Sequence, residues 1–130
     1  MKILVGYDGT NAAKEAIALA EQHAQVFGAT IILVYSMAGG PEVPRKDFET
    51  AENSLEQEKY VLIDKKIPCE TIMSVRGLEA GEDLVQLADE RRAVEIIIGV
   101  RRRSKVGKII FGSTAQYVVL NAPCPVVTVK

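Results

Sequence analysis

The chain has 130 residues, of which 48% are hydrophobic and 25% are charged, and its formal net charge is −1. This size and composition predict one globular domain over residues 1–130 and exclude a disordered chain. The apolar runs are far too short to cross a bilayer, and the first residues lack an apolar stretch of signal-peptide length, so we expect a cytoplasmic protein with no membrane partner. The two cysteines, Cys69 and Cys124, lie in apolar extended runs and are expected to be buried structural thiols.

Short apolar runs alternate with longer amphipathic stretches in the first half of the chain. Residues 2–7 are typical of a buried strand, and the polar turn that follows offers N-caps to a helix over 12–27, which Gly28 can end. Residues 30–35 form a second buried strand. The Gly- and Pro-rich segment 36–45 predicts a loop.

The same alternation continues in the second half. A charged, weakly amphipathic helix is expected over 47–65, a strand over 69–75, and a third helix after the turn that begins at Arg76. A strand over 94–100, a basic loop, a helix over 113–120 and a strand over 125–129 complete the chain. Strands that are apolar throughout and separated by helices predict an α/β, Rossmann-like fold, a doubly wound parallel sheet with helices on both faces.

In such a sheet, ligands bind outside the carboxyl ends of the strands. This rule selects residues 6–9, Tyr35 with Ser36, Arg76 with Gly77, and the segment from Gly99 onward. The last of these runs into a helix that begins near Gly112. Exposed N–H groups at a helix start, beside a glycine and hydroxyl side chains, are suited to binding an anion.

Several stronger motifs are excluded. Seven residues separate Gly99 from Gly107 where a Walker A loop requires four, and Ile109 follows Lys108 where Ser or Thr is required. The only histidine, His23, lies in the middle of a predicted helix, so we expect no Ser-His-acid arrangement and a surface or satisfied core role for this side chain.

Charge is distributed unevenly along the chain. All 17 acidic residues precede position 101, whereas six of the 16 cations follow position 100 without any carboxylate among them. This asymmetry favours an anion near the C-terminal third. Nucleic acid is disfavoured as that anion, because the basic loop has no stacking aromatic before Phe111, which we expect in the core.

The sequence resembles the universal stress protein family. The stretch from Gly99 to Ser113, "GVRRRSKVGKIIFGS", is similar to that family's nucleotide-binding signature, with Gly99 as its first glycine and Gly112 with Ser113 as its closing pair. The opening "ILVGYDGT", the stretch "RGLEAGEDLVQLADERRAVEIIIGV" and the ending "CPVVTVK" also resemble their counterparts, in order along the whole chain.

The resemblance implies a five-stranded sheet of order 3-2-1-4-5, a homodimer, and ATP bound across the loops that follow the first and fourth strands. Under this resemblance Asp8 would meet the adenosine, the backbone of Tyr35 would lie near adenine, and Gly112 would approach the phosphates. Together with the positions at the strand ends and in the basic loop, this gives the predicted cofactor-binding residues Gly6, Tyr7, Asp8, Tyr35, Ile98, Gly99, Arg101, Arg102, Gly112, Ser113, Thr114 and Ala115.

Arg102 departs from the family pattern, because it stands where the signature has its second glycine. If the backbone there requires a positive φ, an arginine is strained; if it does not, the guanidinium can replace a backbone contact with a charged one to phosphate.

Several functional readings remain open at this point. The ligand is ATP or, alternatively, AMP or ADP, with Mg²⁺ or Mn²⁺ as an optional partner of the phosphates. A stress-response or signalling module that responds to occupancy is the main hypothesis; a slow ATPase or a homodimeric interaction protein without nucleotide are the alternatives. Asp8 is either a ligand contact or a helix cap. Residues 125–129 are the expected pairing strand of the homodimer.

Overall fold

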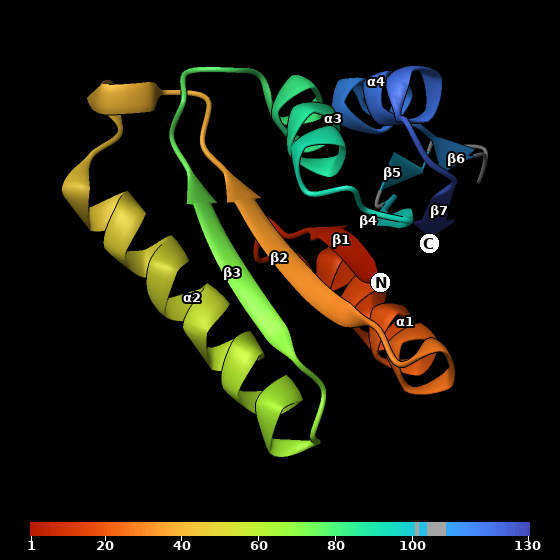
Figure 1. Ribbon diagram of the computed structural model, residues 1–130. Helices are drawn as coiled ribbons and strands as arrows, with labels where there is room; N and C mark the ends of the chain where they lie inside the picture. Colours follow the sequence, from red (N-terminus) through yellow and green to blue (C-terminus); the bar gives the residue numbers. More distant parts are fainter. Residues whose placement is uncertain (101, 104–108) are drawn as a thin grey trace.

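A computed structural model describes residues 1–100, 102–103 and 109–130, with the backbone alone for 102–103 and 109–110 (Figure 1). The strands are β1 (Lys2–Gly6), β2 (Thr30–Ser36), β3 (Cys69–Ser74), β4 (Glu95–Gly99), β5 (Arg102–Arg103), β6 (Ile109–Ile110) and β7 (Val126–Val129). The helices are α1 (Asn11–Phe27), the 3-10 turn η1 (Gly40–Glu42), α2 (Arg45–Asp64), α3 (Ala80–Glu90) and α4 (Ser113–Asn121).

Five strands form one parallel sheet in the order β3-β2-β1-β4-β7. Counted along the chain without the short β5 and β6, this is the predicted order 3-2-1-4-5, and the prediction is confirmed. The central strand β1 pairs through Ile3 with Ile31 on one side and with Glu95 on the other. The chain leaves β1 toward α1 on one face of the sheet and leaves β4 toward α4 on the other face. The loops after these two neighbouring strands therefore separate, and a doubly wound sheet has room for a ligand at this point.

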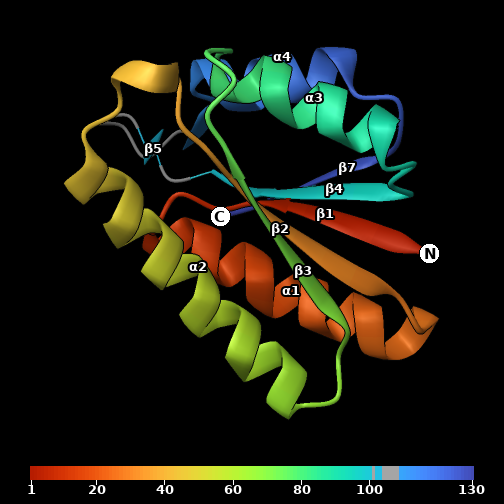
Figure 2. The same ribbon diagram turned by 60° about the vertical axis from the view of Figure 1, so that its left-hand side comes forward.

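Helices cover both faces of the sheet, as predicted (Figure 2). On one face α1 and α2 pack against alternate strand residues, with a core that includes Ile3, Val5, Ile31, Leu33, Ala16, Ala20, Leu55 and Leu62. On the other face α3 and α4 cover Leu4, Ile32, Val34, Ile96 and Ile98. The three inner strands β1, β2 and β4 therefore bury both of their faces, which explains their continuous apolar runs, whereas the edge strands β3 and β7 are only partly buried.

Local signals fix the ends of α1. The Thr10 hydroxyl accepts a hydrogen bond from the backbone N–H of Ala13 at 3.2 Å and so caps the helix start. Gly28 ends the helix in the left-handed conformation, with φ 67°. The predicted helix over 12–27 therefore agrees with the structure to within one residue.

Three local features were not predicted. Helix α2 begins at Arg45 rather than near residue 47, directly after Pro44, which takes the N-cap position. The loop over 36–45 contains the short turn η1. Within the expected basic loop, β5 and β6 form an antiparallel pair in which Arg102 lies opposite Ile110. Arg102 thus has extended backbone, which every residue type adopts, so its replacement of a glycine requires no left-handed conformation.

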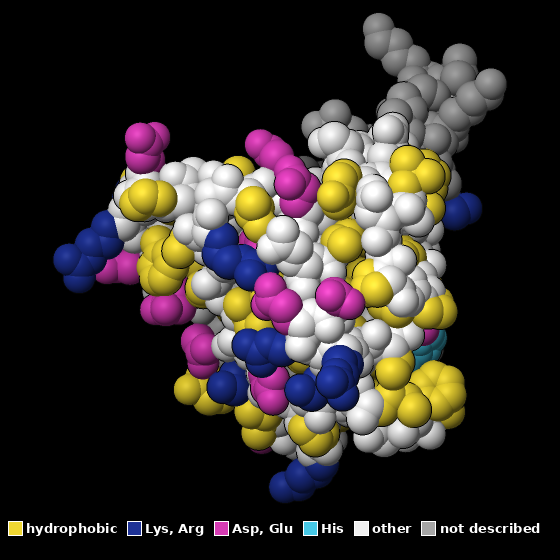
Figure 3. Space-filling view, turned by 45° about the horizontal axis from the view of Figure 1, so that its top comes forward, with side chains coloured by type: hydrophobic (Ala, Val, Ile, Leu, Met, Phe, Trp, Pro, Cys, Tyr) yellow, Lys and Arg dark blue, Asp and Glu magenta, His cyan; other side chains and the backbone are white. Residues whose placement is uncertain are grey.

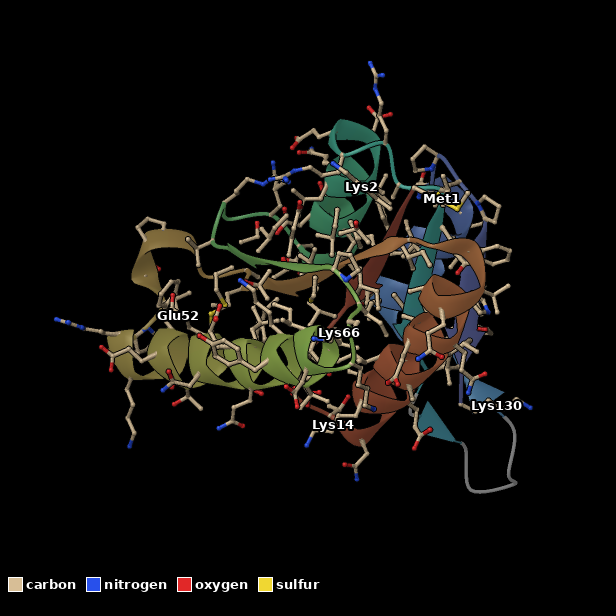
Figure 4. The ribbon with its side chains drawn as sticks, turned by 60° about the horizontal axis from the view of Figure 1, so that its bottom comes forward. Met1, Lys2, Lys14, Glu52, Lys66 and Lys130 are labelled. Carbon is tan, nitrogen blue, oxygen red and sulfur yellow. The ribbon has the colours of Figure 1, made fainter. Side chains whose placement is uncertain are left out.

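The two edges of the sheet differ in character. Figure 4 shows the amino edge, with Met1 and Lys2 at the start of β1 and Lys66 beyond the end of α2. None of the helices in the described ranges combines the length and apolar character needed to cross a membrane. The carboxyl edge, at the top of Figure 1, carries the loops that the sequence selects as candidate ligand contacts.

Candidate functional site

A pocket of about 330 Å³ opens at the carboxyl edge, between the ends of β1, β2 and β4 and the starts of α3 and α4. Its lining consists of Gly6, Tyr7, Asp8, Thr10, Ala13, Val34, Ser36, Ala80, Leu84, Ile98, Gly99, Val100, Gly112, Ser113, Thr114 and Ala115. The volume lies at the lower end of the range of small-molecule sites, which is about 300–1,000 Å³.

The start of α4 forms one wall of this pocket. Gly112 is the N-cap residue, and none of the described side chains caps the helix. The first N–H groups of a helix have no partner within the helix, and its dipole makes this end partially positive. The hydroxyls of Ser113 and Thr114 lie beside these groups, and the first turn contains no acidic residue. This wall is therefore suited to an anion.

Packing among the described residues does not explain the glycine at position 112. A Cβ atom built there would meet no described atom within 4 Å, and φ is −71°, which any residue can adopt. Gly112 itself lines the pocket. An N-cap that lacks both a side chain and steric neighbours leaves the backbone open to close approach by a ligand.

Gly99 has the opposite explanation. A Cβ at Gly99 would lie 2.4 Å from the carbonyl oxygen of Ala12 and 2.9 Å from the Ala12 side chain. The first turn of α1 thus packs directly on the end of β4. The fold itself requires this glycine, even though the residue also lines the pocket.

Asp8 lies between the start of α1 and the pocket. Its Oδ1 accepts hydrogen bonds from the backbone N–H of Thr10 at 3.1 Å and from the Thr10 hydroxyl at 2.6 Å. Thr10, and not Asp8, caps α1, so Asp8 supports the helix start through Thr10. Asp8 also lines the pocket.

Tyr35 lies behind Asp8 rather than in the pocket lining. Its hydroxyl donates a long hydrogen bond of 3.4 Å to the backbone carbonyl of Asp8, and its ring makes an edge contact with Tyr7. Burial, followed by the nearby Asp8, raises the pKa of the Tyr35 phenol.

A buried polar cluster supports the β2 side of the pocket. Asp83, in the first turn of α3, is only 1% exposed. Its Oδ1 accepts hydrogen bonds from Arg76 Nη2 at 2.6 Å and Nε at 2.9 Å, and its Oδ2 accepts one from the Ser36 hydroxyl at 2.6 Å. Arg76 also contacts Glu90 through Nη1 at 3.1 Å. The cluster joins the ends of β2 and β3 to the start of α3.

These contacts keep Asp83 ionised. Burial by itself would raise the pKa of this carboxyl, but the hydrogen bond from Ser36, the nearby Ser74 hydroxyl, and the hydrogen bonds and charge of Arg76 bring the pKa below its ordinary value. The Ser74 Oγ is buried and makes no hydrogen bond of ordinary length, yet it lies near enough to favour the charged form. The same pair raises the pKa of the Arg76 guanidinium, through its hydrogen bond to Asp83.

Nine of the twelve predicted binding residues line this one pocket: Gly6, Tyr7, Asp8, Ile98, Gly99, Gly112, Ser113, Thr114 and Ala115. Tyr35 does not line it. Arg101 lies outside the described residues, as does the Arg102 side chain. The lining also includes residues that the resemblance did not supply, among them Thr10, Val34, Ser36 and Leu84.

Three other expectations need correction or refinement. Phe111 is 39% exposed rather than in the core, and it lies in the segment that leads into the start of α4. Cys69 is buried, and burial raises the pKa of its thiol to about 11, but Cys124 is only partly buried. His23 is not isolated from the strands: its Nδ1 lies 2.6 Å from Oε1 of Glu95, the first residue of β4, at the edge opposite the pocket.

Comparisons with known proteins agree along the full length of the chain. The model of the universal stress protein family matches residues 1–130. A universal stress protein of Thermus aquaticus is 34% identical over 134 residues, covering 98% of this chain and 97% of that protein.

Solved structures give the same result. A universal stress protein of Archaeoglobus fulgidus has a TM-score of 0.90 and 34% identity, covering 100% of this chain and 98% of that one. A structure of the universal stress protein from the same organism in complex with dAMP has a TM-score of 0.86 and 30% identity, with the same coverage. The chain described here belongs to the universal stress protein family.

Proposed function

We propose that this protein binds an adenine nucleotide in the carboxyl-edge pocket, with ATP, ADP and AMP as the candidate ligands. One observation carries the proposal: the α4 start lines the pocket at Gly112, where, among the described residues, no side chain caps the helix and no packing requires a glycine. Anionic groups bind at such helix starts. The complex of the Archaeoglobus fulgidus relative with dAMP supports the choice of an adenine nucleotide.

The pocket offers different surroundings along its length. In the proposed complex the phosphates contact the backbone N–H groups and hydroxyls of Ser113 and Thr114. The sugar lies over the end of β1, beside Asp8. The base lies toward β2, where Val34 and Leu84 supply apolar contacts. Mg²⁺ or Mn²⁺ enters this proposal only as a counter-ion of the phosphates.

Nucleic acid is not part of the proposal. Figure 3, tilted so that the top of Figure 1 comes forward, shows Lys and Arg interspersed with Asp and Glu on this face. A protein that binds a polyanion through its backbone presents cations over an extended face or groove. The described part of this face offers no such continuous basic surface.

The biological role proposed here is that of a stress-response or signalling module whose conformation or partners change with nucleotide occupancy. The pocket lies where α1, α3 and α4 all begin, so a bound ligand contacts three helices at once. A slow ATPase is the alternative if the bound nucleotide turns over. We further propose a homodimer that pairs through β7, the open edge of the sheet.

The nucleotide proposal is tested by variants at Gly112. An aspartate at this N-cap can bond to the free N–H groups of α4, so Gly112→Asp is expected to stabilise the helix by up to about 1 kcal/mol while its charge repels the phosphates. Gly112→Asn is the matched control, since it caps the helix with a side chain of the same shape and no charge. Both variants should keep or raise the melting temperature, and the aspartate should weaken nucleotide binding more than the asparagine.

Binding is measured by native mass spectrometry of the purified protein and by thermal shift with ATP, ADP or AMP. A nucleotide at 100 times its dissociation constant stabilises the folded state by about 2.7 kcal/mol. Failure of all three nucleotides to co-purify with the protein or to raise its melting temperature would refute the proposal. Equal affinity of the wild type and Gly112→Asp would also contradict it, because the phosphates would then bind elsewhere.

A further inference from the structure

The β2 end of the pocket presents a single hydroxyl in an otherwise apolar setting. Ser36 lines the pocket beside Val34 and Leu84. Its hydroxyl lies 2.6 Å from Oδ2 of Asp83, which is itself 1% exposed. Asp83 does not line the pocket, so a ligand would meet Ser36 but not the carboxylate behind it.

The hydrogen-bond geometry fixes the direction of the Ser36 hydroxyl. Arg76 directs two N–H groups at Oδ1 of Asp83, at 2.6 and 2.9 Å, and a guanidinium can only donate. An ionised carboxylate can only accept. The proton between Asp83 and Ser36 must therefore come from the serine. With its one proton engaged, the Ser36 oxygen has only lone pairs to offer to the pocket.

Sheet order locates this oxygen relative to the anion-binding wall. Ser36 ends β2, Gly99 ends β4 and leads through the hairpin to α4, and β1 lies between the two strands. Neighbouring strands are about 4.8 Å apart, so Ser36 lies about 10 Å across the sheet from the β4 side. A nucleotide whose phosphates meet the start of α4 would bring its base, and not its phosphates, to Ser36.

We propose that Ser36 is a specificity-determining residue that accepts a hydrogen bond from the exocyclic amine of a 6-aminopurine, and that Asp83 and Arg76 are positioning residues that keep this hydroxyl in its accepting orientation. A 6-oxopurine presents a carbonyl at the same place, so two acceptors would face each other without a proton between them. The pocket therefore distinguishes adenine from hypoxanthine and guanine at this atom. This inference rests on the proposed nucleotide binding.

The test compares AMP with inosine monophosphate, which carries oxygen in place of the amine, by titration calorimetry. The wild type should bind AMP at least about tenfold more tightly. The ring nitrogen N1 also differs between the two ligands. The diagnostic quantity is therefore the affinity for AMP divided by the affinity for inosine monophosphate, compared between the wild type and each variant. Ser36→Ala removes the acceptor and should lower the ratio by about tenfold, mainly by weakening AMP.

Asp83→Asn provides a sharper test, at a residue that does not touch the ligand. Arg76 can only donate, so it should hold the amide oxygen of the new side chain, and the amide nitrogen would then face Ser36. Ser36 would accept from that nitrogen and turn its own proton toward the pocket. The variant should therefore bind inosine monophosphate better relative to AMP than Ser36→Ala does.

Ser74→Ala is the matched control. It removes a hydroxyl close to the same carboxylate but not from the pocket lining, so the AMP to inosine monophosphate ratio should stay as in the wild type. Circular dichroism and thermal unfolding establish that each variant is folded. If Asp83→Asn does not fold, Ser36→Ala and Ser74→Ala still decide the question.

Three results would overturn the inference while leaving nucleotide binding intact. The first is an unchanged ratio in Ser36→Ala. The second is an equal fall of the ratio in Ser74→Ala. The third is a change in the ratio of AMP to dAMP rather than AMP to inosine monophosphate, which would mean that Ser36 contacts the sugar. If the wild type binds neither AMP nor inosine monophosphate, the proposed function itself has failed.

Discussion

Glycines at the two ends of the signature segment serve different purposes. A Cβ at Gly99 would overlap the backbone of Ala12, whereas a Cβ at Gly112 would meet no described atom within 4 Å. We expect Gly99→Ala to lower the free energy of unfolding by about 1–3 kcal/mol, because the first turn of α1 must move away from β4. Gly112→Ala should change it by less than about 1 kcal/mol. Urea denaturation of both variants measures the difference, and equal destabilisation would contradict it.

The Asp83 cluster predicts a pH dependence of stability. The pKa of this carboxyl is lower in the folded protein than its ordinary value of about 4, so its contribution is fully present above that pH and is lost as the pH falls through the folded-state pKa. Asp83→Asn should lower the free energy of unfolding at pH 7 by about 1–3 kcal/mol.

The difference in free energy of unfolding between the wild type and Asp83→Asn should shrink as the pH is lowered from 7 toward 2. Asp83 of the wild type is then protonated, and the wild type loses the stabilisation that the ionised carboxylate gives. Urea denaturation across this range provides the measurement. Glu49→Gln serves as a control, since the ion pair of Glu49 with Arg45 is exposed on the surface of α2 and should contribute little at any pH. A deficit that stays constant with pH would contradict the ionised state of Asp83.

Individual site residues were predictable only in part. Gly6, Asp8, Gly99 and Ser113 follow strands or precede a helix, so the topology alone brings them to one edge. Asp83 gave no such signal, because an acidic residue in the first turn of a helix is ordinarily exposed and favourable to the helix dipole. Its inward direction becomes evident only once Ser36 and Arg76, distant in sequence, lie beside it.

Long helices and strands were predicted more reliably than elements of two or three residues. Apolar runs such as 94–100 identify buried strands because a parallel sheet covers both faces of each strand. The hairpin of β5 and β6 escaped prediction, since two-residue strands carry no periodicity and the segment that contains them holds five cations in eight positions. The 3-10 turn at Gly40–Glu42 is similarly short, and its loop composition conceals it.

Helix ends offer a prediction at the element scale. α1 ends in Gly28, but the turns after α2 and α3 place Lys66 and Arg92 in the left-handed region, with φ 66° and 53°. A residue with a Cβ is strained in this conformation. Lys66→Gly and Arg92→Gly should each raise the free energy of unfolding by about 0.5–1 kcal/mol, despite the greater freedom of glycine in the unfolded chain.

Chemical denaturation of these two variants and of their combination measures the gain. The sites are on different helices, so the two increments should add. Gly28→Ala is the reciprocal control and should lower the free energy of unfolding by a similar amount. The new Cβ would meet no described atom within 4 Å, but the alanine would be strained at the positive φ of this position. A loss of stability in Lys66→Gly would indicate that the lysine side chain contributes more than its backbone strain removes.

At the scale of the whole molecule, the two edge strands of the sheet, β3 and β7, have different surroundings. β3 is flanked by α2, whereas β7 follows α4, whose Val119 and Leu120 are 50% and 81% exposed. An open strand beside exposed apolar side chains is a favourable surface for pairing with a second copy of the chain. This arrangement supports β7 as the proposed dimer interface.

Backbone directions in β7 allow the interface to be tested without disturbing the sheet. The carbonyl groups of Pro125 and Val129 accept hydrogen bonds from the N–H groups of Ile96 in β4 and of Val100 just after it. The backbone groups of Thr128, which alternates with these residues, therefore face away from β4. Thr128→Pro therefore removes a donor from the edge but none from the pairing with β4. We expect the variant to keep its fold and to become monomeric.

Thr128→Val is the matched control, because it retains the backbone N–H and the shape of the side chain and should remain dimeric. Sedimentation velocity at several concentrations measures the state of all three proteins, and circular dichroism checks the fold. A dimeric Thr128→Pro would place the interface away from this edge, and a monomeric wild type would refute the dimer. Because α4 connects the pocket wall to β7, nucleotide binding and dimerisation can be coupled. Comparing the dimer dissociation constant with and without AMP measures this coupling. If AMP tightens the dimer, the monomeric variant must bind AMP more weakly than the dimeric wild type, and if AMP loosens the dimer, the variant must bind AMP more tightly.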